Sequence, residues 1–351
     1  MKILVYGAGP LGSLFAVRLK QGGHKVVLLA RGQRLKDLRR YGVVLNNWQT
    51  GKQASIRVKI VESLAAEDSY DLVLVIMRKK FALDILPILA SNHHTPNVLF
   101  LMNNFAGPQK FIKSLGKERV LIGFPGAAGY REGHIVYYLT GDKQRPTHVY
   151  IGEVDGCITE RLEKIATAIE KAPYFEAQIR TDMDAWLKTH IAFLISSLAP
   201  ALYMCGTDNY RMSRTRDALI LTIRAIKENF QVLKALHIPI TPLSLKIFAM
   251  LPEPFLVHYL RRMMSNPRME VAMVKHAKSV RADIKIPANE FLKAARRTKF
   301  PIPSIEKLYP HIDKETPQMP EGSKKIQLDW SGVLIPLVII MVLSVCLIYI
   351  L

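Results

Sequence analysis

Residues 2–12 read K-I-L-V-Y-G-A-G-P-L-G, and this stretch decides the fold of the first half of the chain. The apolar run up to Tyr6 is typical of a buried parallel strand, and a glycine-rich turn follows it at once. Apolar residues then recur with helical spacing at Leu14, Phe15, Val17 and Leu19. This order of strand, turn and helix predicts a Rossmann-like unit that binds a dinucleotide.

The expected cofactor-binding motif consists of six consecutive residues: Gly7, Ala8, Gly9, Pro10, Leu11 and Gly12. Gly7 permits a tight turn, Gly9 lets the backbone approach the pyrophosphate, and Gly12 lets helix and strand pack closely. The free N–H groups at the helix N-terminus are expected to face the phosphates. Such a glycine pattern is weak by itself, and its place directly after the first strand makes it specific.

Arg31 follows a second predicted strand at 25–30, about twenty residues beyond the glycine motif. An NAD enzyme would carry Asp or Glu there to hold the ribose hydroxyls. The guanidinium of Arg31 suits the 2′-phosphate of NADPH instead, with Arg34 as an assistant. Taken alone, Arg31 is equally consistent with a surface loop, but its position after the second strand favours NADPH.

Further apolar strands are predicted at 72–77, 98–102 and 120–124, which gives an α/β fold with a doubly wound parallel sheet. The carboxyl ends of such strands face the ligand crevice. Arg78 and Asn103 each follow a predicted strand, so both are expected beside the cofactor.

With 351 residues, 49% of them apolar, the chain is long enough for two domains with real cores. A net charge of +20 attracts polyanions, yet the basic residues are spread out and no nucleic-acid motif accompanies them, so no nucleic-acid partner is expected. The spacing of cysteines and histidines predicts neither a disulfide framework nor a metal site. A homodimer is compatible with the sequence.

Residues 333–351 contain no charged side chain and would cover about 28 Å as a helix, which predicts a transmembrane helix. A buried terminal strand or helix is the less favoured alternative. Residues 309–332 are polar and rich in proline, which predicts a tether. Because the chain starts in the nucleotide motif, the body is expected in the cytoplasm, with Lys324 and Lys325 at the inner membrane surface.

The chain resembles the ketopantoate reductase family over residues 1 to about 308. The resemblance is carried by G-A-G-P-L-G with A-R-G at 30–32, N-N-F-A-G at 103–107, R-E-G-H-I-V at 131–136, I-G-E-V-D-G at 151–156, W-L-K at 186–188 and F-P-I-P at 300–303. Family members reduce 2-dehydropantoate to pantoate with NADPH, on the route to pantothenate and coenzyme A. The resemblance implies a Rossmann-like domain, placed at 1–180, a helical domain at 181–308, and substrate between them.

Helices are predicted in the second half at 183–204, 214–236, in a stretch covering 255–283, and at 289–298. On the first, Lys188, Ala192 and Ser196 are spaced i, i+4 and i+8, hence on one helix face. By resemblance Lys188 is the general acid of ketone reduction, and Asp283 stands where the family has a glutamate that orders the site. Without the resemblance, a lysine snorkelling from an apolar helix is the more common interpretation.

Several positions depart from the family pattern. Arg78 replaces a lysine, Ala192 and Ser196 replace two asparagines that face the substrate, and Val271 falls near a substrate-binding serine. Hydride transfer can survive these changes, whereas recognition of ketopantoate is less secure because each lost polar partner weakens binding by about 1 kcal/mol. Two hypotheses therefore stand: an NADPH-dependent 2-oxoacid reductase, and a membrane-tethered NADPH-binding sensor or scaffold without turnover.

Overall fold

The computed structural model describes residues 1–333, apart from the side chains of residues 271, 276, 279, 280, 282 and 283. The chain divides into two compact units. Unit 1 consists of Met1–Ile191 and Val271–Glu290, and unit 2 of Ala192–Glu270 with the chain from Phe291 onward. Apart from Val333, the expected transmembrane helix at 333–351 lies outside the described residues.

Unit 1 is built on an eight-stranded sheet of order β12-β11-β8-β7-β6-β1-β2-β5. Its strands are β1 (Lys2–Tyr6), β2 (Lys25–Leu29), β5 (Lys59–Val61), β6 (Leu72–Val75), β7 (Val98–Leu101), β8 (Val120–Phe124), β11 (Thr147–Glu153) and β12 (Phe175–Ile179). All neighbours are parallel except β8 and β11, which are antiparallel. The predicted doubly wound sheet is thus confirmed, with one antiparallel pairing that the sequence did not predict.

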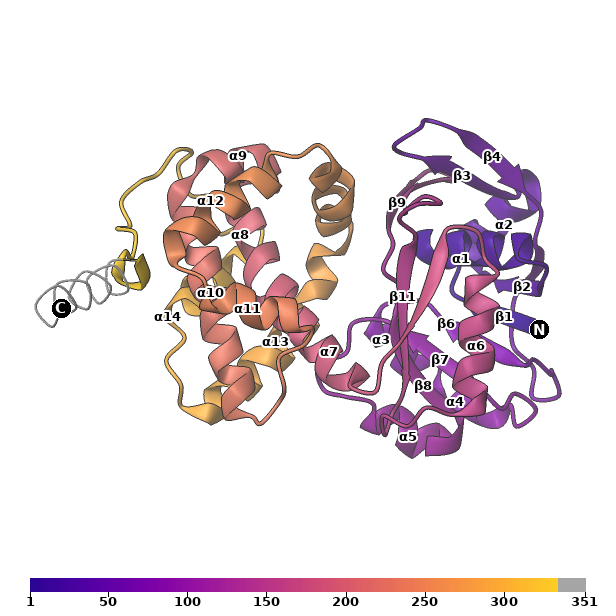
Figure 1. The fold of residues 1–351 in the computed structure, drawn as a ribbon. Coiled ribbons are helices and arrows are strands. Elements are labelled where there is room, and N and C mark those ends of the chain that lie inside the picture. Colours follow the sequence, from indigo (N-terminus) through magenta and orange to yellow (C-terminus); the bar gives the residue numbers. More distant parts are fainter. Residues whose placement is uncertain (334–351) are drawn as a thin grey trace, which may run out of the picture. The chain divides into compact units, whose positions relative to one another are not determined.

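Alternate residues of the central strand point into two separate hydrophobic cores. Ile3 and Val5 join the core formed with α1 (Pro10–Gln21) and α6 (Glu160–Glu170). Leu4 and Tyr6 join the core formed with the helices on the other face (Figure 1). Those helices are α3 (Lys79–Asp84), α4 (Leu86–Ser91), α5 (Gln109–Leu115) and α7 (Met183–His190). The sheet is therefore covered on both faces, as parallel sheets require.

A second sheet of order β4-β3-β10-β9 belongs to the same unit. Its strands are β3 (Val43–Asn47), β4 (Gln53–Ile56), β9 (Ala128–Glu132) and β10 (Ile135–Leu139), and the chain reaches it through α2 (Gly32–Tyr41). Strands β9 and β10 pack against α1, so this sheet covers the helix that starts at the glycine turn. A short 3₁₀ helix, η1 (Lys117–Arg119), precedes β8.

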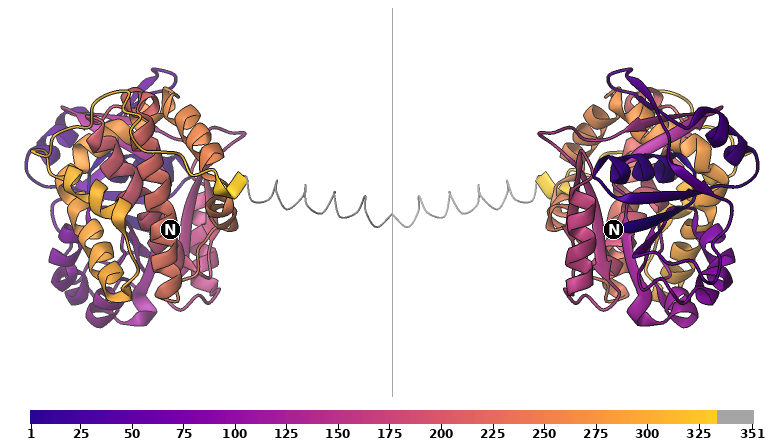
Figure 2. Two further views of the ribbon diagram at one scale, coloured as in Figure 1. Left: turned by 90° about the vertical axis from the view of Figure 1, so that its left-hand side faces the viewer. Right: turned by 90° about the vertical axis from the view of Figure 1, so that its right-hand side faces the viewer.

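Unit 2 is helical and is organised around α10 (Arg216–Ala235) (Figure 2). Helix α10 contacts α8 (Ala199–Met204), α9 (Asn209–Arg214), α11 (Leu243–Met250), α12 (Glu253–Met264) and α14 (Pro303–Leu308). Helix α14 leads into the 3₁₀ helix η4 (Tyr309–Ile312). The helical second half is confirmed, although α11 was not predicted.

The predicted helix at 183–204 exists, but its centre is a π-helix, η2 (Ile191–Leu198), between α7 and α8. Pro200, just beyond η2, has no N–H to donate to the preceding turn, which removes one α-helical hydrogen bond where η2 ends. By length and composition the stretch Met183–Met204 could cross a membrane, but 72% of its apolar window is buried inside the protein. It is therefore weak evidence for a membrane span.

Two helix boundaries differ from the prediction. The stretch covering 255–283 is interrupted after Met264, where the sequence S-N-P-R at 265–268 favours a turn. The chain then resumes as a π-helix, η3 (Glu270–Lys275), and α13 (His276–Thr298). Helix α13 continues through Pro287 and so joins two segments that were predicted as separate helices.

The segment expected to be a tether continues beyond η4 along unit 2, and we call residues 318–330 the C-terminal strap. Arg211 donates to the carbonyl of Met319 at 2.7 Å, and the amide of Met319 donates to the carbonyl of Met204 at 3.0 Å. The carboxylate of Asp217 accepts from the amides of Lys325 and Ile326 at 2.8 and 2.9 Å. Figure 2 shows the strap in yellow crossing the outside of these helices. The strap is thus held to α9 and α10 over most of its length.

Candidate cofactor and catalytic site

The turn between β1 and α1 has the geometry that the glycine motif predicts. Gly7 has φ +121°, and a Cβ placed there would lie 2.6 Å from the carbonyl oxygen of Ile76. A Cβ on Gly12 would lie 1.7 Å from the carbonyl oxygen of Gly7. At Gly9, by contrast, nothing described lies within 4 Å of a Cβ. Two glycines therefore permit the turn itself, while the third leaves open space above it.

The N-terminus of α1 suits an anion. The helix begins at Pro10, its N-cap Gly9 offers no side-chain cap, and no acidic residue stands in the first turn. Helix first-turn N–H groups have no intrahelical acceptor and carry partial positive charge. Ala8, Pro10 and Leu11 are partly exposed around them. A diphosphate above Gly9 would meet these N–H groups, so the turn fits the pyrophosphate of a dinucleotide.

Arg34 is buried and stabilises this turn through hydrogen bonds. Its guanidinium donates to the carbonyl of Ala8 at 3.1 Å, to the hydroxyl of Ser13 at 3.0 Å and to the carbonyl of His134 at 3.1 Å. Burial, reinforced by Arg131, lowers the pKa of Arg34 to about 10. Three of its five N–H groups thus position the turn, and the assistance that Arg34 was expected to give at the 2′-phosphate stays a prediction.

Arg31 stands free at the carboxyl end of β2. It is the exposed N-cap of α2, and its guanidinium makes no hydrogen bond or ion pair with the residues that the structure describes. Since β2 lies next to β1, Arg31 and the glycine turn emerge from adjacent strands at the same edge of the sheet. An unpaired guanidinium at this place is available to a phosphate.

Arg78 and Asn103 follow β6 and β7, the next strands along the same edge. Arg78 is the exposed N-cap of α3. The side-chain oxygen of Asn103 is buried and has no hydrogen-bond partner among the described residues. The neighbouring Asn104 is almost fully buried, donates to the carbonyl of Gly107 at 2.7 Å, and leaves its own oxygen unpartnered. Sequence reasoning missed Asn104, although the N-N pair at 103–104 pointed to it.

Lys188 lies beside the loop that these asparagines begin. Its ammonium forms an i, i+4 ion pair with Asp184 at 2.5 Å, and its side chain is only 20% exposed. A Cβ placed on Gly107 would lie 3.9 Å from Nζ of Lys188 and 3.4 Å from Oδ1 of Asp184. The structure therefore brings Lys188 to the 103–107 loop within unit 1. Asp184 was missed, although its spacing from Lys188 was readable.

A second lysine, Lys79, is fixed under the same loop. Its ammonium lies 2.6 Å from the carboxylate of Glu290, and its side chain is 9% exposed. The other oxygen of Glu290 accepts from the amide of Ala106 at 3.2 Å. Burial lowers the pKa of Lys79, which the ion pair with Glu290 partly opposes. Glu290 thus ties the start of α3 to the 103–107 loop, a contact between residues far apart in the sequence.

Ala192 and Ser196 lie in unit 2, on the π-helix η2. The one-face stripe with Lys188 assumed α-helical spacing, which ends at His190. Ala192 is fully buried, and its carbonyl accepts from Asn229 at 2.7 Å and from Ser197 at 3.0 Å. The hydroxyl of Ser196 is buried without a partner among the described residues. Asn229 was not recognised from the sequence.

Asp283 and Val271 belong to helices α13 and η3, but their side chains lie outside the described part of the structure. The role given to Asp283 stays a prediction.

Residues 3–156 match the model of a family described as ketopantoate reductase PanE/ApbA. Among curated proteins, a 2-dehydropantoate 2-reductase of Lactococcus lactis is 27% identical over 128 residues, which is 35% of this chain and 40% of that protein. An uncharacterised oxidoreductase of Bacillus subtilis is 27% identical over 176 residues, 48% of this chain and 54% of that protein. The matched part thus spans about half, or less, of these relatives.

Solved structures show the same fold over most of the chain. A D-mandelate dehydrogenase with NADH and anilino(oxo)acetate superposes with a TM-score of 0.71 at 17% identity, covering 89% of this chain and 97% of that chain. A 2-dehydropantoate 2-reductase from Geobacter metallireducens gives a TM-score of 0.70 at 17% identity, covering 90% and 100%. At this identity the likeness establishes the fold.

Proposed function

We propose that this chain reduces a 2-oxoacid with NADPH. The match to the ketopantoate reductase PanE/ApbA family model and the similarity to its curated relatives support this proposal. The proposed substrate is ketopantoate, which would give pantoate for pantothenate biosynthesis, or a related 2-oxoacid. The observation that carries the proposal is the coincidence within unit 1 of an open dinucleotide turn at Gly9 and a partly buried lysine, Lys188, beside the 103–107 loop.

The cofactor assignment rests on the residues around the turn. Space above Gly9, unopposed N–H groups at the start of α1 and the unpaired Arg31 fit a dinucleotide that carries an extra phosphate. Bound NADPH supplies the hydride. The solved mandelate dehydrogenases carry NADH, so the preference for the phosphorylated cofactor rests on Arg31 of this chain.

Lys188 is proposed as the general acid. As hydride adds to the carbonyl carbon, the C=O double bond becomes a single bond and the oxygen acquires the electron pair. The ammonium of Lys188 gives a proton to that oxygen, which yields the hydroxyl product and leaves a neutral amine. Before transfer, the same positive charge stabilises the developing alkoxide. Asp184 holds the side chain in place through the ion pair.

The proposed substrates include 2-oxoacids other than ketopantoate. In place of two amides, this chain has Ala192, whose side chain can donate nothing, and Ser196. One neighbour in fold was solved with anilino(oxo)acetate, an aromatic 2-oxoacid derivative. A panel of substrates should therefore contain both aliphatic and aromatic 2-oxoacids.

A membrane location is part of the proposal, with the catalytic body in the cytoplasm. It rests on the uncharged sequence from Val333 to Leu351, on Lys324 and Lys325 before it, and on the overall charge of +20.

The proposal is tested with the full-length protein in detergent micelles. Oxidation of NADPH is followed at 340 nm with ketopantoate and the substrate panel, while NADPH fluorescence reports binding without turnover. Lys188→Met should abolish reduction and keep NADPH binding. The matched control is Lys113→Met, an exposed lysine at the end of α5, which should behave as the parent. Unchanged turnover in Lys188→Met would disprove the general-acid role.

The competing sensor or scaffold hypothesis makes a different prediction for the same experiment. It expects tight NADPH binding with no oxidation by any 2-oxoacid. This outcome would exclude the reductase and retain the cofactor site.

A further inference from the structure

A cluster of large apolar side chains is exposed on α11 and the first turns of α12. Six residues, which we call the apolar corner, are between 44% and 81% exposed: Leu243, Ile247, Met250, Leu251, Phe255 and Tyr259. Leu243 and Ile247 are four residues apart on α11 and thus lie along one side, and Leu251 follows as the extended C-cap of that helix. No residue of α11 is buried. An exposed apolar cluster of this kind marks an interaction surface.

The charge around the apolar corner is one-sided. Between residues 243 and 262 the sequence contains one acidic residue, Glu253. Its side chain is 6% exposed, and both its oxygens accept from Arg224 at 2.8 and 2.9 Å. Lys246, His258 and Arg261, in contrast, are exposed. The helices of the corner therefore offer apolar and basic side chains, and their one carboxylate is paired inside with Arg224; the exposed Asp329 of the strap adds one acidic group beside them.

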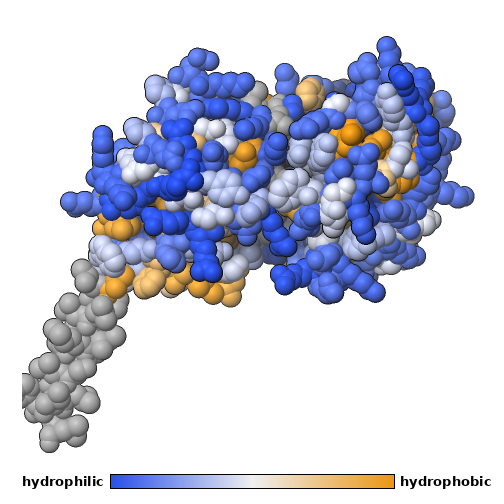
Figure 3. Space-filling view, turned by 90° about the horizontal axis from the view of Figure 1, so that it is seen from above, coloured by the Kyte–Doolittle hydropathy of each residue, from blue (hydrophilic) through white to orange (hydrophobic). Residues whose placement is uncertain are grey.

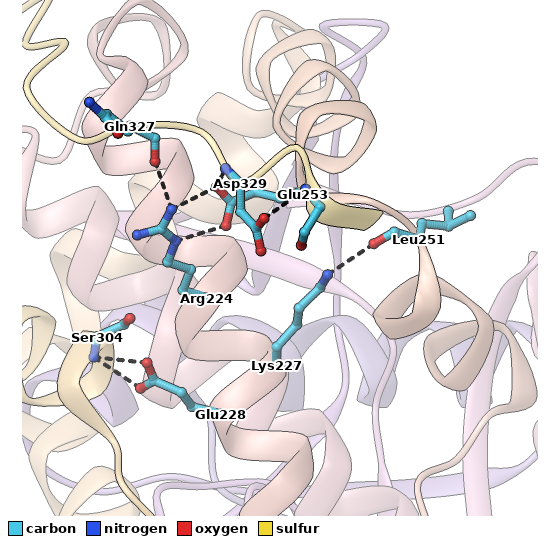
Figure 4. Close-up of polar contacts among 9 residues, drawn as sticks. Arg224, Lys227, Glu228, Leu251, Glu253, Ser304, Gln327 and Asp329 are labelled. Atoms are coloured by element: carbon cyan, nitrogen blue, oxygen red, sulfur yellow. Dashed lines mark hydrogen bonds and ion pairs between the residues drawn. The ribbon is translucent and has the colours of Figure 1, made fainter. Parts of the chain in front are cut away.

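The C-terminal strap ends at this corner. Arg224 donates to the carbonyl of Gln327 at 2.7 Å, and the amide of Asp329 donates to Glu253 at 2.9 Å. From the same side of α10, Lys227 donates to the carbonyl of Leu251 at 2.9 Å. Figure 4 shows Arg224, Gln327, Glu253 and Asp329 joined into one network, with the bond from Lys227 to Leu251 separate beside it. The end of the strap and the start of α12 are thus fastened to each other.

The chain stays close to the start of α12 beyond Asp329, up to the end of the described residues. A Cβ placed on Gly332 would lie 3.4 Å from Cβ of Pro252, and Trp330 is half exposed beside it. The uncharged sequence 333–351 starts at that point. Figure 3 shows apolar side chains gathered where the chain leaves the described part of unit 2.

We propose that the apolar corner, together with Trp330, inserts into the interfacial layer of an anionic membrane, next to the point where residues 333–351 enter it. A helix that lies in the interface presents apolar side chains to the acyl boundary and basic ones to lipid phosphates. Trp and Tyr suit this layer because their rings are largely apolar and carry a polar N–H or O–H, and the apolar ring of Phe suits its acyl side. The inference rests on the membrane anchor proposed above, and it adds a defined face of unit 2 that touches lipid.

A lipid surface fits better than a second protein as the occupant. The corner adjoins the start of a sequence long enough to span a bilayer, so insertion of that sequence would hold the corner near the headgroups. Its excess of basic over exposed acidic groups matches anionic headgroups.

The test uses full-length protein reconstituted into vesicles of phosphatidylcholine and phosphatidylserine with nitroxide-labelled lipid. In a background with Cys157→Ser and Cys346→Ser, an environment-sensitive fluorophore is attached at Met250→Cys. The matched control carries it at Lys234→Cys, an exposed position at the end of α10. A third sample labels the native Cys346 in the C-terminal sequence, with only Cys157 replaced.

The proposal expects a blue-shifted, lipid-quenched fluorophore at 250 and an unshifted, unquenched one at 234. If the label at 346 is quenched while that at 250 behaves like that at 234, the anchor stands and the lipid face is refuted. If neither 250 nor 346 is quenched, the anchor and the lipid face both fail. Cross-linking between copies at 250 without lipid quenching would assign the corner to a dimer and overturn the proposal. NADPH oxidation by the same vesicles reports separately on the proposed reductase.

Discussion

Gly9 and Gly12 stand three residues apart in the same turn, and the structure predicts opposite consequences for adding one methyl group to each. Gly9 has φ −69° and ψ −174°, a conformation open to any residue, and nothing described lies within 4 Å of the new methyl. Gly9→Ala should therefore fold normally. Gly12→Ala places its methyl 1.7 Å from a backbone oxygen, which forces α1 away from β1.

The expected magnitudes separate the two variants. Overpacking of this kind costs about 1–3 kcal/mol, and each kcal/mol lowers Tm by about 2–4 °C in a unit of 150–250 residues. For Gly12→Ala we expect a clear loss of thermal stability. In Gly9→Ala the methyl occupies the space proposed for the pyrophosphate. Loss of one hydrogen bond to a charged phosphate costs about 1.5–3 kcal/mol, which raises the Kd for NADPH about 10- to 150-fold.

Thermal unfolding and an NADPH fluorescence titration of both variants test this reasoning. Gly9→Ala should keep the parent Tm without ligand and lose most of the stabilisation that added NADPH gives. If Gly9→Ala binds NADPH as the parent does, the pyrophosphate does not lie against Gly9 and the cofactor assignment is wrong. A reduced Tm in unliganded Gly9→Ala would instead show that the space above the turn is filled by the protein.

Arg31→Ala should weaken NADPH binding about 10- to 150-fold and leave NADH binding nearly unchanged, since it removes a charge-assisted bond to the 2′-phosphate alone. Arg39→Ala, on the same helix, serves as the control. Equal losses of affinity for both cofactors would contradict the assignment. Asp217→Asn should release the C-terminal strap, seen as faster hydrogen exchange at the amides of Lys325 and Ile326. Burial acts to raise the pKa of Asp217, but hydrogen bonds from the strap outweigh it and the pKa is lowered from 3.8. The strap contact is therefore fully present above pH 3.8 and is lost as pH falls through the lower, folded-state pKa, so exchange that does not respond to acid would refute this account.

The strands that carry the cofactor turn could be predicted because they are buried on both faces. Residues 2–6, 72–75 and 98–101 are continuous apolar runs, and each agreed with its prediction to within two residues. Strands β4 (Q-A-S-I) and β9 (A-G-Y-R-E) are partly exposed and contain polar residues, so no apolar run marks them. Strand β10 (I-V-Y-Y-L) is an apolar run that was not predicted as a strand. Tertiary context, not local sequence, assembles that second sheet.

The site residues divide in the same way. The turn geometry of Gly7 and Gly12 was readable because it follows from their position within one strand-turn-helix unit, whereas the role of Arg31 stays a prediction. The structural contact of Arg34 with the carbonyl of His134 was missed because it joins residues one hundred positions apart. Glu290 was missed for the same reason, since its partner Lys79 lies 211 positions away. Contacts of this separation leave no periodic signal in a single sequence.

The position of Lys188 bears on the choice between a catalytic lysine and a snorkelling one. A snorkelling lysine extends its ammonium into bulk water and needs no partner. Lys188 instead has 80% of its side chain covered and binds Asp184 at 2.5 Å. Its ammonium lies beside Gly107, where an added Cβ would be 3.9 Å away. In the proposed reaction the ammonium gives its proton to the alkoxide, and the carboxylate of Asp184 remains beside a neutral amine. That negative charge favours return of a proton from solvent to the amine, so the same ion pair that positions the acid also prepares it for the next turnover.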